Sequence, residues 1–172
     1  MKAIETALSL TQAYKLGIER FEKMLGNEFA KAVETMNNSS THIIVCGMGK
    51  SGLVGRKISS TLASTGTPSI FLHPAEAIHG DLGKVQKNAV VLLISYSGET
   101  GEIIALIPAF KRLDVNIIAL TGVKNSTLAN ISDIVLDTSV DREACPLNLA
   151  PTTSTMITMV LGDALAVSLM EL

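Results

Sequence analysis

Three serine and threonine side chains lie within six residues in the segment Ser95-Tyr96-Ser97-Gly98-Glu99-Thr100, which follows an apolar run. Hydroxyls and the unpaired N–H groups at the start of a helix can donate hydrogen bonds to an anion, and the helix dipole favours negative charge there. One serine or threonine would satisfy an ordinary helix cap. Three hydroxyls beside a glycine that permits close backbone approach therefore favour a phosphate-binding loop.

A second loop, Gly47-Met48-Gly49-Lys50-Ser51-Gly52, fits the G-x-G-x-x-G pattern of dinucleotide-binding domains. Those domains also carry an acidic residue at the end of the second strand, whereas that strand here ends in Leu72-His73-Pro74. Lys50-Ser51 matches the end of a P-loop, but Ile44 stands where that motif has its first glycine. Both nucleotide-binding interpretations are weakened, and a glycine turn needed only for packing remains an alternative.

The elements that must hold these loops follow from the apolar pattern. Between Ile4 and Met36 apolar residues recur every three or four positions, which predicts one or two amphipathic helices that end at Asn37–Ser40. Short β-rich runs then alternate with helical stretches. The predicted strands are His42–Cys46, Ser69–Leu72, Val90–Ser95, Asn116–Leu120 and Ile134–Asp137. The predicted helices are Leu53–Ser64, Gly101–Leu113 (kinked near Pro108), Ser126–Ile131 and Thr155–Met170.

This alternation predicts an α/β fold, a doubly wound five-stranded parallel sheet with helices on both faces. Several strands are continuous apolar runs, as burial on both faces requires. In a flavodoxin-like strand order 2-1-3-4-5 the ligand crevice lies between the first and third strands, so both loops should face it. The sequence has no repeat or linker, and we expect a single domain over residues 1–172, with an N-terminal helical segment (1–36) and an α/β core (41–172).

The composition argues against several classes of function. A net charge of −2 leaves no basic footprint for nucleic acid. No signal-peptide pattern is present, and the apolar stretch Met156–Met170 contains Gly162 and Asp163 and is shorter than a bilayer span, so we expect a cytoplasmic protein without a membrane partner. Cys46 and Cys145 lack metal or disulfide spacing, which predicts reduced thiols and no metal site. The excess of apolar (47%) over charged (17%) residues predicts faces covered by sister subunits.

The motif Ser95-x-Ser97-Gly98-x-Thr100 resembles the phosphate motif of SIS (sugar isomerase) domains. The resemblance continues in the segments Gly47–Gly52, His73–Ala77, His79–Gly83 and Glu143–Thr152. Together these segments resemble the arabinose-5-phosphate isomerases that start the route to the eight-carbon sugar Kdo, over nearly the whole chain. Many members of that family also carry a pair of CBS domains and a histidine in a His-Pro-Gly-Gly segment after the last SIS helix. The 172 residues contain neither.

The resemblance implies an isomerase that interconverts D-ribulose 5-phosphate and D-arabinose 5-phosphate through an enediolate, without a metal or cofactor. It further implies a homotetramer that serves lipopolysaccharide or capsule synthesis. The catalytic residues that it implies are Lys50, His79, Glu102 and Glu143. The substrate and phosphate site that it implies consists of Gly49, Ser51, Ser95, Ser97, Gly98 and Thr100.

Such an isomerisation needs a base, an acid for the oxygens, and donors that face the developing oxyanion. Glu102 and Glu143 could carry protons, with pKa values raised toward neutrality in a closed pocket. Lys50 would stabilise the enediolate or a phosphate oxygen, and His79 could open the sugar ring or shuttle a proton. Plainer interpretations exist: the helix dipole favours an acid at Glu102 in any case, and Glu143 could pair with Arg142 at the surface.

Three other functions remain open from the sequence. The domain could bind a sugar phosphate as a regulatory module without converting it, or isomerise another phosphosugar, or bind a dinucleotide. His42, which opens a strand, and His73 are interpreted as structural.

Overall fold

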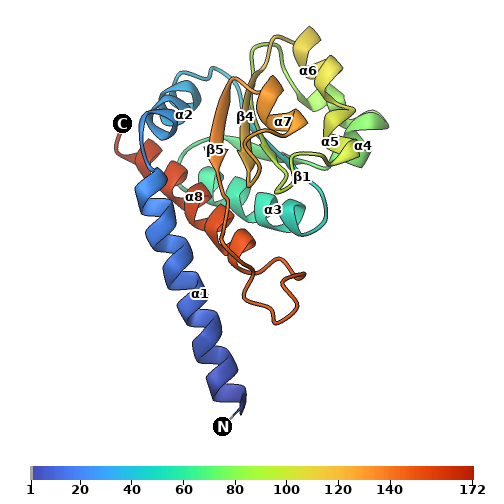
Figure 1. Cartoon of the computed structure of the whole chain (residues 1–172). Helices are drawn as coiled ribbons and strands as arrows, with labels where there is room; N and C mark the ends of the chain where they lie inside the picture. Colours follow the sequence, from blue (N-terminus) through green and yellow to red (C-terminus); the bar gives the residue numbers. More distant parts are fainter. Residues whose placement is uncertain (1) are drawn as a thin grey trace.

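The computed structural model describes residues 2–172 and contains a five-stranded parallel sheet between two layers of helices (Figure 1). The strands are β1 (Ile43–Gly47), β2 (Ser69–Leu72), β3 (Val90–Ile94), β4 (Asn116–Thr121) and β5 (Ile134–Asp137). Their order is β2-β1-β3-β4-β5, with every neighbouring pair parallel. The predicted doubly wound, flavodoxin-like sheet is confirmed, and each strand ends within one residue of its predicted bounds.

Helices cover both faces of this sheet. One face carries α1 (Lys2–Met24), α2 (Asn27–Asn37), α3 (Gly49–Ser64) and α8 (Thr153–Met170). The other face carries the shorter helices α4 (Pro74–Ile78), α5 (Gly101–Ile104), α6 (Ile107–Arg112) and α7 (Thr127–Ile131), with the 3-10 turn η1 (Asp81–Lys84).

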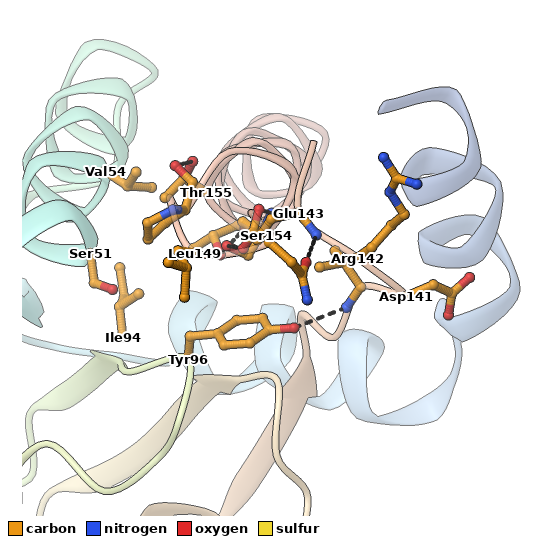
Figure 2. Close-up of a pocket in the computed structure, with 14 residues that line it drawn as sticks. Ser51, Val54, Ile94, Tyr96, Asp141, Arg142, Glu143, Leu149, Ser154 and Thr155 are labelled. Carbon is orange, nitrogen blue, oxygen red and sulfur yellow. Dashed lines mark hydrogen bonds between the residues drawn. The ribbon is translucent and has the colours of Figure 1, made fainter. Parts of the chain in front are cut away.

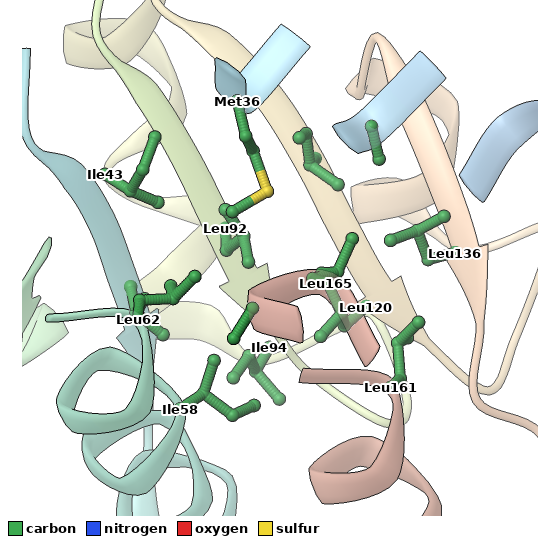
Figure 3. Close-up of a cluster of buried hydrophobic side chains, with 14 of the residues drawn as sticks. Met36, Ile43, Ile58, Leu62, Leu92, Ile94, Leu120, Leu136, Leu161 and Leu165 are labelled. Atoms are coloured by element: carbon green, nitrogen blue, oxygen red, sulfur yellow. The ribbon is translucent and has the colours of Figure 1, made fainter. Parts of the chain in front are cut away.

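Successive side chains of a strand point to opposite faces, and the strand residues are divided between two cores accordingly. In β3, Leu92 enters the core beneath α3 and α8, whereas Leu93 enters the core beneath α4 to α7. Both are fully buried. Figure 3 shows the first core, where Ile58 of α3 lies next to Ile94 of β3, and Leu161 of α8 belongs to the same cluster. Burial on two sides explains why the strands are unbroken apolar runs.

α7 and α8 begin within two residues of their predicted starts, and the larger differences from prediction lie elsewhere in the helices. α3 begins four residues early, at Gly49, and Gly52 lets its first turn approach the sheet: a Cβ on Gly52 would lie 2.6 Å from the Gly47 carbonyl oxygen. The predicted helix Gly101–Leu113 is two short helices, α5 and α6, because Pro108 has no N–H to continue the hydrogen-bond ladder. α4 and η1 were not among the predicted helices, although a proline suits the first turn of a helix, where α4 has Pro74.

The last helix, α8, fills the first core with Leu161 and Leu165 buried. It has 18 residues, three more than the stretch Met156–Met170, and by length and composition alone it could cross a membrane. It is the one helix within residues 2–172 of which this is true. In this fold 44% of that window is buried, where α8 packs on α1, α2 and α3. Core packing accounts for the buried part of this apolar helix, whereas Val167 and Met170 near its end are exposed.

The first helix, α1, projects beyond the body of the molecule at its N-terminal half (Figure 1). Ile4 and Leu8 are 67% and 62% exposed, whereas Phe21 is buried in the first core. Gly17 lies against α8, where a Cβ would be 3.0 Å from Thr153 Cγ2. The C-terminal half of α1 is thus part of the core, and the N-terminal half presents apolar side chains to solvent.

Candidate active site

A cavity of about 310 Å³ lies between the loops that follow β1, β3 and β5 and the first turns of α8 (Figure 2). Parallel strands bring these loops together, because their carboxyl ends meet at one edge of the sheet. β1 and β3 are direct neighbours, with Gly47 opposite Ile94. The cavity therefore lies at the switch point between the first and third strands, with Ser51 and Tyr96 in its wall.

The loop after β3 is held by its own hydroxyl groups. Ser95 is buried, and its Oγ lies 2.7 Å from Thr100 Oγ1 and accepts a hydrogen bond of 3.1 Å from the Gly98 N–H. Ser97 is exposed, and its Oγ accepts a hydrogen bond of 3.2 Å from the Glu99 N–H. Gly98 has a φ of +67°, a conformation that favours glycine. The hydroxyl groups are therefore oriented before any ligand binds.

The segment after β5 is tied to the rest of the site by two side chains. The Tyr96 hydroxyl accepts a hydrogen bond of 3.3 Å from the Val140 N–H, which connects this segment to the loop after β3 (Figure 2). Arg20 of α1 donates hydrogen bonds of 2.8 Å to Asp141 Oδ1 and to Ser139 Oγ. These contacts fix the chain immediately before Glu143.

Glu143 lies in the cavity wall and caps the start of α8. Its carboxylate accepts hydrogen bonds from the Thr152 N–H at 2.7 Å, from the Thr152 hydroxyl at 3.0 Å and from the Ser154 N–H at 3.3 Å. The Ser154 hydroxyl donates a further, short hydrogen bond to it. The plainer interpretation of Glu143 as the partner of Arg142 is therefore wrong: its partners are at the N-terminus of a helix, where a negative charge is stabilised.

The pKa of Glu143 moves in the direction opposite to prediction. Burial raises it, but the hydrogen bonds from Ser154 and Thr152 more than offset burial and hold the pKa below its ordinary value. The expectation of a pKa raised toward neutrality is wrong for this residue. Glu143 is therefore ionised at neutral pH, and the hydrogen bonds that lower its pKa also make it a weaker base than a free carboxylate.

Most of the other predicted site residues do not line this cavity, and the predicted phosphate ligands Ser95, Ser97, Gly98 and Thr100 are among those outside its lining. Ser51 lines it, whereas Gly49 and Lys50 are exposed in the first turn of α3. Glu102 is half-buried in α5, and His79 is exposed at the end of α4, with Nδ1 2.8 Å from the Ala75 carbonyl oxygen. α4 packs against α5, so these two residues belong to neighbouring helices. Of the four predicted catalytic residues, Glu143 alone lines the cavity.

Several lining residues were missed by the sequence analysis. Asn148 accepts a hydrogen bond of 2.7 Å from the Glu143 N–H, and Ser154 and Thr155 form the wall on α8. A signal was available: the run Thr152-Thr153-Ser154-Thr155 gathers hydroxyls at the start of a helix, as the loop after β3 does. Within residues 2–172, no three His, Cys, Asp or Glu side chains gather where they could hold a metal ion.

The chain matches the model of the SIS domain over residues 36–168. It is 56% identical over 147 residues to the arabinose 5-phosphate isomerase KdsD of Pseudomonas aeruginosa, which covers 86% of this chain and 45% of that protein. It is 51% identical over 155 residues to the arabinose 5-phosphate isomerase KpsF of Escherichia coli O6:H1, covering 90% and 47%. The chain thus spans about half the length of these relatives.

A solved structure, that of E. coli CFT073 c3406 in complex with arabinose 5-phosphate, superposes with a TM-score of 0.90 at 38% identity and covers 99% of this chain and 90% of that one. The sequence motifs, the sheet order and these similarities agree. The chain belongs to the SIS domain family.

Proposed function

We propose that this chain carries the substrate site of an aldose–ketose isomerase that interconverts D-arabinose 5-phosphate and D-ribulose 5-phosphate. The observation that carries the proposal is that Ser51, Tyr96 of the loop after β3 and Glu143 line one cavity at the switch point of the sheet, and that the hydroxyl-rich segment Ser95–Thr100 contains Tyr96. Relatives that are 51% to 56% identical over most of the chain bear the name arabinose 5-phosphate isomerase. A cavity of about 310 Å³ is in the range that small ligands use.

The substrate phosphate is proposed to bind to the loop that follows β1 and the loop that follows β3. The Ser97 Oγ already accepts a hydrogen bond from Glu99, so its own proton is free to be donated. One of the Ser95 and Thr100 hydroxyls donates a hydrogen bond to the other. The O–H of the accepting hydroxyl is then free to donate to a phosphate oxygen. The proposed phosphate and substrate ligands are Gly49, Ser51, Ser95, Ser97, Gly98 and Thr100.

Ser97→Ala tests this phosphate site. It should weaken the binding of arabinose 5-phosphate by about 1–3 kcal/mol, because a charged group loses a donor. Calorimetry measures the change. Ser64→Ala is the control, since Ser64 is an exposed serine at the far end of α3 that bonds only within its helix. Equal affinity in both variants would count against the assignment.

Glu143 is the proposed base. It takes the proton from C2 of the open-chain aldose, the C–H electron pair becomes the C1=C2 bond, and the carbonyl pair moves to O1. O1 takes up a proton and O2 loses one, so that C2 becomes the carbonyl carbon, and the proton returns to C1. Lys50 stabilises the oxyanion, and Glu102 and His79 serve the proton transfers at the oxygens and ring opening.

The assembly and location of the protein belong to the same proposal. The exposed apolar residues of α1, including Ile4 and Leu8, fit a subunit contact, and we propose a cytoplasmic homotetramer. Static light scattering at micromolar concentration tests it, and a monomer would overturn this part.

The experiment that decides the function is incubation with each pentose 5-phosphate in D₂O, followed by NMR. Conversion in both directions with deuterium at the carbon next to the carbonyl supports an enediolate isomerase. Tight binding without conversion would overturn it in favour of a regulatory sugar-phosphate module. Faster conversion of another phosphosugar would replace the substrate and keep the chemistry.

A further inference from the structure

We infer that Ser154 is a positioning residue for Glu143, and that its hydroxyl selects Oε1 of that carboxylate as the oxygen that takes the substrate proton. This inference rests on the proposed function, because it assigns a partner to the proposed base.

The two carboxylate oxygens of Glu143 have different surroundings. Oε2 accepts three hydrogen bonds, from the N–H and hydroxyl of Thr152 and from the N–H of Ser154. Oε1 accepts one within the described residues, from the Ser154 hydroxyl. A carboxylate oxygen has about two lone-pair sites. Oε2 is therefore saturated by the start of α8, and Oε1 alone keeps capacity for a proton.

Ser154 is built to hold that oxygen in place. It is 3% exposed, lies in the second position of α8 and lines the cavity beside Thr155 (Figure 2). A buried side chain on a helix of 18 residues has little freedom to change rotamer, so Oε1 keeps one direction relative to the cavity. Groups held in this way by rigid elements have the precision that proton transfer requires.

The hydroxyl of Ser154 is not needed to cap the helix. Oε2 already accepts hydrogen bonds from the N–H of Ser154 in the first turn of α8 and from the N–H of Thr152, the residue that precedes the helix. These N–H groups belong to the backbone and would remain in a Ser154 variant, so the cap of α8 would remain as well. The Ser154 hydroxyl donates instead to Oε1. The Ser154 hydrogen bond also lowers the pKa of Glu143 against the effect of burial, which keeps the carboxylate ionised.

Ser154→Ala tests the inference by kinetics. We expect kcat to fall about ten- to a hundred-fold, the effect of one hydrogen bond to a charged group, with KM changed less than about two-fold because the phosphate loop is untouched. The acidic limb of the kcat/KM profile should move to higher pH, since the base loses a donor to its ionised form. Ser154→Thr restores the hydroxyl and should recover most of the rate. Ser168→Ala, the same change near the other end of α8, should behave as wild type.

A second measurement does not depend on turnover. The pKa of the Glu143 side chain, followed by NMR of ¹³C-labelled glutamate, should be higher in Ser154→Ala than in wild type and in Ser168→Ala. Suppose that the wild-type chain turns over substrate and that Ser154→Ala has the same kcat, the same acidic limb and the same Glu143 pKa as wild type. This result overturns the inference about Ser154 and leaves the proposed function standing. A wild-type chain that converts neither pentose phosphate overturns the proposed function and, with it, the catalytic role of Ser154.

Discussion

Gly98 lies so close to Ser126 that a Cβ atom on residue 98 would stand 2.0 Å from the Ser126 hydroxyl oxygen. That hydroxyl is itself engaged, because it accepts a hydrogen bond of 3.3 Å from the Ala129 N–H at the start of α7. The loop after β3 and the first turn of α7 are thus fitted to one another with no room for a side chain.

Gly98→Ala should therefore damage both stability and ligand binding. The left-handed conformation costs an alanine about 1–2 kcal/mol, and the overlap with Ser126 adds to it. We expect a lower urea midpoint and weak or absent binding of arabinose 5-phosphate in calorimetry. Gly101→Ala is the matched control, because a Cβ on Gly101 meets nothing within 4 Å. Equal behaviour of the two variants would contradict this account of the loop.

Lys50→Ala and Glu102→Gln should lower kcat far more than they raise KM, if these residues act in the transition state. General acid–base groups typically contribute about a hundred- to ten-thousand-fold. Lys50 is exposed, so its removal should change the free energy of unfolding by less than about 0.5 kcal/mol, and lost activity cannot be attributed to unfolding. Lys87→Ala, before β3 at the opposite edge of the sheet, is the control. A proportional rise in KM alone would assign Lys50 and Glu102 to binding.

The sheet could be predicted because its signals are local. Unbroken apolar runs such as Val90–Ile94 identify strands buried on both faces, and hydroxyls or glycines after them identify the ligand edge. The break between α5 and α6 could be foreseen only in part, since Pro108 marks a distortion without saying where the helix stops.

The environment of Glu143 could not be predicted, because its partners follow nine and eleven residues later, at Thr152 and Ser154. Only the closed loop brings them together. Burial and hydrogen bonding have opposite effects on its pKa, and the sequence does not say which dominates.

The two cysteines should differ sharply in reactivity. Burial raises the pKa of the Cys46 thiol to about 12. Cys145 accepts hydrogen bonds from the N–H groups of Ala150 at 3.1 Å and Leu149 at 3.0 Å, which lower its pKa. Because the thiolate is the nucleophile, a disulfide reagent at pH 8 should modify one thiol per folded chain quickly. Cys145→Ser should abolish that phase and Cys46→Ser should keep it; equal rates for both thiols would contradict the prediction.

Acid should destabilise the fold through Glu143 and Asp137. For both, burial raises the pKa but hydrogen bonds outweigh it, from Ser154 and Thr152 for Glu143 and from Ser139 with Lys124 for Asp137. The unfolded chain then binds protons at higher pH than the folded chain. The stabilisation is complete above the ordinary values of 4.5 and 3.8 and is lost as pH falls through the lower folded values.

Urea unfolding at a series of pH values measures this loss. Glu143→Gln should show a smaller decrease in the free energy of unfolding between about pH 5 and pH 3 than wild type, because one of the two linked protons is removed. Parallel curves for the two proteins would show that the cap of α8 does not contribute.

The attachment of α1 sets a limit on how small the domain can be made. The family match begins at residue 36, yet Phe21 fills the first core and Arg20 anchors the segment that leads to Glu143. A chain cut back to residues 36–168 would expose the face of α8 that Gly17 and Phe21 cover and would release Asp141 from its anchor. The family match is therefore narrower than the part of the chain that packs into the first core and holds the segment before Glu143.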